Sequence, residues 1–272
     1  MIFNFSANSF GPLKGNSAHQ VAMKHGIMLY QQNALFTYIP KNACSTLRLS
    51  AAIANGCITS IEQGHWIHKN NQTFNPTLAE AVKVDYSFVV LRCPFRRLAS
   101  VFLDKFVGKE GPVWAYRDLA NREVNLDEMH FRKFVLSLKK ASFLNLDDHW
   151  RPQSSFLLYK QYSDYFSMEQ FSHLIETLEK KLMLNIVDAR PLTKHGTDIL
   201  DIVVDKDFSR IKVAKLYNLK RQGKVPSYES LYTPDLIEIV KSLYKADFDT
   251  YLKHFPESDL LFPYTTSIVS DK

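Results

Sequence analysis

The stretch LFTYIPKNACSTLRLSAAIANG, from Leu35 to Gly56, decides the fold that this sequence predicts. Its apolar start is typical of a short strand, and Thr46–Asn55 has the apolar spacing of a helix, which Gly56 ends. The tight loop before this helix, PKNACST (Pro40–Thr46), carries a lysine and two hydroxyl side chains. Because a helix N-terminus presents unpaired N–H groups and a partial positive charge, the stretch predicts an anion site.

This loop differs from the usual nucleotide loop, G-x-x-x-x-G-K-[ST]. Both glycines are missing, and Lys41 comes before the small residues instead of after them. An ordinary ATP or GTP loop is therefore disfavoured. The alternative without a ligand is a plain loop in which Ser45 caps its helix and Lys41 lies in solvent.

A second strand, loop and helix occur in VVLRCPFRRLASVFLDKF (Val89–Phe106). The apolar run Tyr86–Leu91 suits a strand buried on both faces of a parallel sheet, and Pro94 then opens a helix. Arg92 stands where the strand ends, and Ser100 follows two helical turns into the helix. A lone arginine can simply pair with an acid. Since ligands bind at the carboxyl ends of strands in open α/β sheets, the two segments together predict two anion sites for one ligand.

The remaining chain has no repeat, no low-complexity segment and no convincing linker, which predicts a single domain over residues 1–272. Residues 26–40 read as two strands around a polar turn, a short helix runs from Thr77 to about Lys83, and residues 108–125 read as a loop. Further helices are expected at about 126–141, 167–184, 206–220 and 234–252. The order of elements predicts an α/β fold with a mostly parallel central sheet and a helix-rich C-terminal half.

Composition limits the class of protein. A net charge of +6 suits an anionic partner, but no basic helix or aromatic–basic sheet motif indicates nucleic acid. Three cysteines predict no disulfide framework and favour a reducing compartment, and no His/Cys cluster has the spacing of a metal site. The start is no signal peptide and no apolar run approaches about 20 residues, so we expect a soluble cytoplasmic protein.

Two segments resemble the sulfotransferase family that uses 3′-phosphoadenosine-5′-phosphosulfate (PAPS). PKNACST is similar to the 5′-phosphosulfate loop of the chondroitin-type carbohydrate sulfotransferases, and RCPFRRLAS resembles the 3′-phosphate motif, with Cys93 where that motif usually has Asp. DDHWRPQ (Asp147–Gln153) and YESLYTPDLIEIVKSLYKADF (Tyr228–Phe248) also resemble the family. The resemblance implies a P-loop-like three-layer sandwich. It also implies that Arg92 and Ser100 bind the 3′-phosphate and that the phosphosulfate is bound by Lys41, Asn42, Ala43, Cys44, Ser45 and Thr46.

The implied activity is in-line transfer of a sulfuryl group from PAPS to a carbohydrate hydroxyl, without a metal. Lys41 would stabilise charge on the leaving oxygen. A histidine suits the role of base, and His68, His149 and His65 are the candidates, with Glu62 as a further possibility. The acceptor stays open among a polysaccharide, a glycolipid of membrane-associated glycan biosynthesis and a small metabolite, and the oligomeric state is not predicted.

Two other functions remain as alternatives. An ATP-dependent kinase on a P-loop-like fold would turn over ATP with Mg²⁺. A non-catalytic module would bind the nucleotide but transfer nothing to any acceptor.

Overall fold

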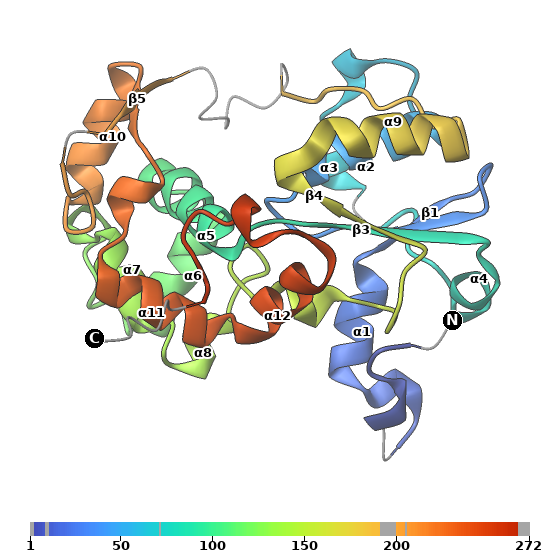
Figure 1. Ribbon diagram of the computed structural model, residues 1–272, viewed down its shortest axis with the longest axis horizontal. Helices are drawn as coiled ribbons and strands as arrows, with labels where there is room; N and C mark the ends of the chain where they lie inside the picture. The colour runs from blue at the N-terminus through green and yellow to red at the C-terminus, as the bar shows by residue number, and fades with distance from the viewer. Residues whose placement is uncertain (1–2, 9–10, 71, 191–199, 205, 266–272) are drawn as a thin grey trace, which may run out of the picture. The chain divides into compact units, whose positions relative to one another are not determined.

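The computed structural model describes residues 3–8, 11–70, 72–190, 200–204 and 206–265 (Figure 1). Its internal contacts divide the chain into two compact units. The first comprises residues 1–92 and 153–195, and the second comprises residues 93–152 and 196–272.

The first unit is built on a four-stranded sheet with the order β1 (Gly26–Leu29), β2 (Ala34–Thr37), β3 (Tyr86–Leu91) and β4 (Asp164–Ser167). β1 runs antiparallel to β2, while β2, β3 and β4 are parallel to one another. The turn between the first two strands contains Asn33 with a positive φ of 43°, which asparagine tolerates well. The predicted strand pair, the buried strand before Arg92 and the mostly parallel sheet are thus confirmed.

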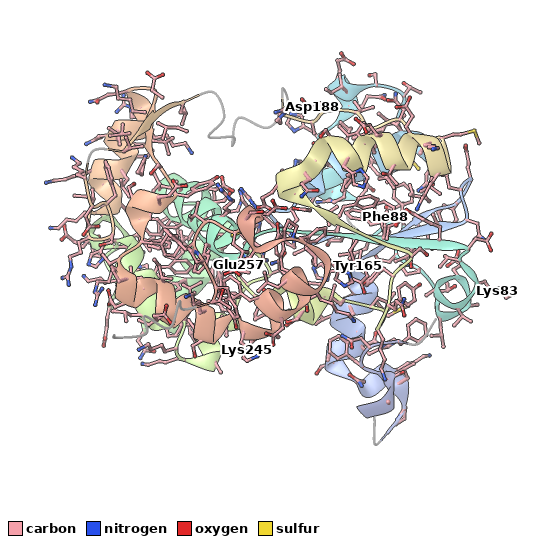
Figure 2. All side chains as sticks on the ribbon, in the orientation of Figure 1. Lys83, Phe88, Tyr165, Asp188, Lys245 and Glu257 are labelled. Atoms are coloured by element: carbon pink, nitrogen blue, oxygen red, sulfur yellow. The ribbon has the colours of Figure 1, made fainter. Side chains whose placement is uncertain are left out.

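Helices cover both faces of this sheet. Figure 1 shows α2 (Cys44–Ala54), α3 (Trp66–Lys69) and α9 (Phe171–Leu182) on one face and α1 (Ser17–Lys24) on the other. Phe88 of β3, labelled in Figure 2, belongs to the core on the α9 side. Its ring stacks on that of Phe36 at 5.0 Å between centroids. Leu35 and Val89 point to the opposite face and are also fully buried. Burial on both faces explains why the strands are continuously apolar.

The second unit is mainly helical. It is organised around aromatic side chains, among them Trp150, which is fully buried and donates from Nε1 to the Phe143 carbonyl at 2.8 Å. A small parallel pair, β5 (Asp201–Val203) and β6 (Lys224–Pro226), accompanies the helices. The helices are α5 (Pro94–Val101), the π-helical η4 (Phe102–Phe106), α6 (Gly111–Leu119), α7 (Phe131–Ser137), α8 (Ala141–Leu144), α10 (Val213–Arg221), α11 (Pro234–Leu243) and α12 (Lys245–His254).

Short elements complete the two units. In the first unit, α4 (Leu78–Lys83) lies where the sequence predicts a short helix. The 3-10 turns are Ser6–Asn8, Leu13–Gly15, Ile61–Gln63, Leu126–Glu128, Gln153–Phe156, Met168–Gln170, Glu229–Leu231 and Glu257–Asp259.

Several expected helix boundaries are wrong. The segment 108–125, expected as a loop, contains α6, which begins at Gly111, has Pro112 in its first turn and buries Val113 and Tyr116. The helix expected over 126–141 is interrupted because the His130 side chain accepts from the Lys133 N–H and starts α7 anew.

Two further expected helices are shorter or divided. The one expected over 206–220 begins only at Val213, since the Asp207 carboxylate accepts from the Ser209 N–H and forms a turn there. The one expected over 234–252 is two helices that meet at Tyr244, whose hydroxyl donates to the Trp150 carbonyl at 2.6 Å.

Candidate functional site

The loop after β2 and the residue after β3 meet at one edge of the sheet. β2 and β3 are neighbouring parallel strands, so their carboxyl ends emerge together. There, the Arg92 guanidinium donates from Nη1 to the Lys41 carbonyl at 2.8 Å. Within the first unit, the structure therefore brings Arg92 to the loop at Lys41, whereas Ser100 belongs to the second unit.

The loop has the conformation that glycine usually supplies, without containing one. Lys41 has φ 74° and Ala43 has φ 54°, both in the left-handed region. For residues with a Cβ atom, this region costs roughly 1–2 kcal/mol each. Asn42, between them, is fully buried and donates from Nδ2 to the Val90 carbonyl at 2.8 Å. The side chain of Asn42 is thus engaged inside the protein, where it holds the strained loop.

The N-terminus of α2 has no side-chain cap. Its N-cap residue is Ala43, so the alternative in which Ser45 caps the helix is wrong. Among the residues that the structure describes, no acceptor is hydrogen-bonded to the N–H groups of Cys44, Ser45 and Thr46. The Thr46 hydroxyl oxygen accepts from the Ala189 N–H at 3.3 Å, which leaves its proton for another acceptor. This first turn can therefore bind an anion with three N–H groups and two hydroxyls.

Two candidate histidines lie on an exposed segment of the first unit. His65 precedes α3 and His68 is within it, and both side chains are exposed. The Arg48 guanidinium of α2 donates to the Ile67 carbonyl and so anchors α3 to α2. The third candidate here, Glu62, is exposed, and a hydrogen bond from the Ser60 side chain lowers its pKa. A lowered pKa makes the Glu62 carboxylate a weaker base.

His149 lies in the second unit and has a carboxylate partner. Its Nδ1 is 2.6 Å from Asp147 Oδ1, which also accepts from the His149 backbone N–H at 2.9 Å. Since Asp147 holds a proton on Nδ1, the lone pair of the neutral ring is on Nε2, the arrangement of a general base.

The segment that carries His149 is anchored to the helix that carries Ser100. Arg97 of α5 donates to the carbonyls of Asp148 and Arg151, at 3.0 and 2.8 Å. Ser100 lies on the same helix, half-buried. Within the second unit, these bonds fix the backbone around His149.

Gln153 is a site residue that the sequence does not single out. Its side chain is 2 % exposed and is paired with the backbone of Arg92, accepting from the N–H at 3.0 Å and donating to the carbonyl at 2.9 Å. It also accepts from Asn42 Nδ2 at 2.6 Å. The signal for Gln153 was its place in the DDHWRPQ block, but the residue type does not reveal the partners.

The described ranges contain no candidate metal centre: within them, no group of three or more His, Cys, Asp or Glu side chains could hold a metal ion. In the same part of the chain, every helix is too short or too polar to cross a bilayer.

Comparison with known proteins identifies a family. A family model described as "Sulfotransferase family" matches residues 24–253, a range that contains the loop, Arg92, Gln153 and the candidate histidines. No curated protein and no solved structure matches the chain significantly.

Proposed function

Because the chain belongs to the sulfotransferase family, we propose that it transfers a sulfuryl group from PAPS to a carbohydrate hydroxyl. Family membership supports a transferase of sulfuryl groups, and the fold of this family is P-loop-like, as is the mostly parallel sheet of this chain. The finer proposal is carried by one observation: the contact between Arg92 and the loop at Lys41, at the carboxyl ends of two parallel strands.

The donor would be held at both of its anionic ends. Lys41 and the first turn of α2, with Ala43, Cys44, Ser45 and Thr46, offer a charge, N–H groups and hydroxyls to the 5′-phosphosulfate. Asn42 acts from inside by holding the loop. Arg92 and Ser100 would bind the 3′-phosphate, an assignment supported by the resemblance of RCPFRRLAS to the family motif.

The chemistry required of these residues is positioning and electrostatic stabilisation. In-line sulfuryl transfer spreads charge over the equatorial oxygens and the leaving bridging oxygen, as phosphoryl transfer does. The Lys41 ammonium group would stabilise the leaving oxygen, while the N–H groups of the helix start orient the sulfuryl oxygens. The loop backbone that carries these groups is anchored by Asn42 and Arg92, so little backbone reorganisation is needed.

A base must accept the proton of the attacking hydroxyl. His149 is favoured among the three histidines, because Asp147 orients its ring and leaves Nε2 for the proton. His68 and His65 are the alternatives. A carbohydrate acceptor is supported by the resemblance of the loop to that of the chondroitin-type enzymes.

Calorimetric titration with adenosine 3′,5′-bisphosphate tests the donor site. We expect a Kd of about micromolar order, with much weaker binding of ADP, which lacks the 3′-phosphate. Arg92→Ala should lose the preference for the bisphosphate over ADP. Arg122→Ala, at an exposed arginine that pairs with Asp118, should keep this preference. Equal affinity for the two nucleotides would contradict the proposal.

A further inference from the structure

We infer that Gln153 is a positioning residue, which sets the shape of the donor-binding loop and ties that loop to Arg92. The inference rests on the proposed function, because it assigns a role within the same site. It begins from the hydrogen bonds of one side chain. The Gln153 amide replaces a strand partner at the end of β3, since it both accepts from and donates to the backbone of Arg92.

The second contact of Gln153 connects the end of β3 to the loop. Asn42 shares its Nδ2 group between Gln153 Oε1 and the Val90 carbonyl. Asn42 lies between Lys41 and Ala43, the two residues with left-handed backbones. Its anchorage to the end of β3 therefore offsets the cost of their conformations, and Gln153 is half of that anchorage.

The Arg92 guanidinium makes a second, direct link between Arg92 and the loop. It donates to the Lys41 carbonyl, so loop and arginine are joined both through the Arg92 side chain and, by way of Gln153 and Asn42, through the Arg92 backbone. A ligand that contacts both the loop and Arg92 needs them at a fixed separation. Gln153 meets this requirement from a buried position, without contact with the ligand.

Only the amide of a side chain of this length can make the hydrogen bonds with the Arg92 N–H, the Arg92 carbonyl and Asn42 Nδ2. Methionine has a similar shape, but it cannot donate to the Arg92 carbonyl, and its thioether sulfur is only a weak acceptor for Asn42 and the Arg92 N–H. Glutamate keeps the two acceptor contacts, but an ionised carboxylate would face the Arg92 carbonyl where Nε2 now donates. When protonated, glutamic acid could donate there again.

The test compares wild type with Gln153→Met, and uses Tyr159→Phe as the matched control. Tyr159 belongs to the same unit, is 1 % exposed and donates to the Ala81 carbonyl at 2.6 Å, so its variant also loses a buried hydrogen bond. Two properties are measured: amide hydrogen exchange of the peptide covering residues 38–47 without ligand, and calorimetric affinity for adenosine 3′,5′-bisphosphate.

In Gln153→Met, we expect the loop amides to exchange at least about tenfold faster and the bisphosphate to bind at least about tenfold more weakly. Tyr159→Phe should show neither effect at a similar loss of melting temperature. Unchanged exchange and affinity in Gln153→Met would overturn the inference, as would equal effects in the control.

Gln153→Glu provides a second variant if the methionine variant does not fold. Burial raises the pKa of a carboxyl group, so the side chain should become neutral on mild acidification. Relative to wild type at each pH, the loop exchange and the affinity of Gln153→Glu should recover as the pH falls; no recovery would argue against the role.

The two proposals fail in different ways. If wild type does not bind the bisphosphate, the proposed donor is wrong, while hydrogen exchange of the free protein still decides whether Gln153 holds the loop. If wild type binds and Gln153→Met binds equally well with an unchanged loop, the donor site stands and the role of Gln153 is wrong.

Discussion

Ala43 has a left-handed backbone, a conformation that glycine adopts more readily than any other residue. A methyl group at φ 54° is strained, and the strain is offset by the buried hydrogen bonds of Asn42. Ala43→Gly removes the strain but increases the entropy of the unfolded chain. We expect the free energy of unfolding to stay the same or rise by up to about 1 kcal/mol.

The control for Ala43→Gly lies on the same helix. Ala52 is fully buried in the interior of α2, where glycine should cost about 1 kcal/mol or more. Urea unfolding of the two variants checks the contrast. A loss of stability in Ala43→Gly as large as in Ala52→Gly would show that the loop is not strained at this residue.

The ring of His149, the favoured base, is oriented by a carboxylate. Its Nδ1 is fixed by Asp147, whereas His65 and His68 are exposed. His149→Gln should therefore reduce kcat of sulfuryl transfer by about 10²–10⁴-fold with little effect on bisphosphate affinity. His65→Gln and His68→Gln, measured in the same assay, should retain near wild-type kcat; a large loss in either would move the base to α3.

At the scale of elements, α4 is stabilised by a complete capping box. The Thr77 hydroxyl accepts from the Glu80 N–H at 3.2 Å, and the Glu80 carboxylate accepts from the Thr77 N–H at 2.7 Å. Thr77→Ala should lower the free energy of unfolding by about 1 kcal/mol.

Protonation of Glu80 should remove part of the same stabilisation. Hydrogen bonds from the Thr77 backbone and then its hydroxyl lower the pKa of Glu80 below 4.5. A lowered pKa in the folded state means that the contribution is present above pH 4.5 and is lost as the pH falls through the folded-state pKa. Urea unfolding of wild type and Glu80→Gln should therefore converge in acid. A constant difference at every pH would mean that the carboxylate does not cap the helix.

Elements whose signals are local could be predicted from the sequence. The strand pair around Asn33, the apolar run of β3 and the helix after the loop depend on neighbouring residues, and all three are present. The break between α11 and α12, by contrast, lies at Tyr244, whose hydroxyl contacts the distant Trp150 carbonyl. A pattern of apolar residues does not contain that contact.

The same distinction applies to the candidate site. Lys41 and Arg92 could be predicted because strand ends place charged residues at a known edge of a parallel sheet. Gln153 is more than sixty residues beyond β3 and has a neutral side chain, so only the folded arrangement reveals its pairing with Arg92. The inward direction of the Asn42 side chain could not be predicted from the sequence either. Asn42 is buried, whereas Lys41 and Ala43 on either side of it are only half-buried.

At the scale of the whole molecule, the net charge of +6 and the proposed anion site both favour the binding of an anionic ligand. A ligand that binds only the folded chain stabilises it by about 2.7 kcal/mol at about 100 times its Kd. For a chain of this size, adenosine 3′,5′-bisphosphate should then raise the melting temperature by roughly 5–10 °C. The increase should be smaller at about 0.5 M salt than at about 0.05 M, because salt screens exposed charges.

Two controls separate specific binding from general charge effects. ADP at the same concentration should produce a smaller increase in melting temperature, since it lacks the 3′-phosphate that Arg92 is proposed to bind. Lys41→Ala should nearly abolish the increase, whereas Lys24→Ala, which removes the same charge from the end of α1, should preserve it. If both lysine variants reduced the increase equally, the stabilisation would come from the net charge of the molecule, and the loop would not be its anion site.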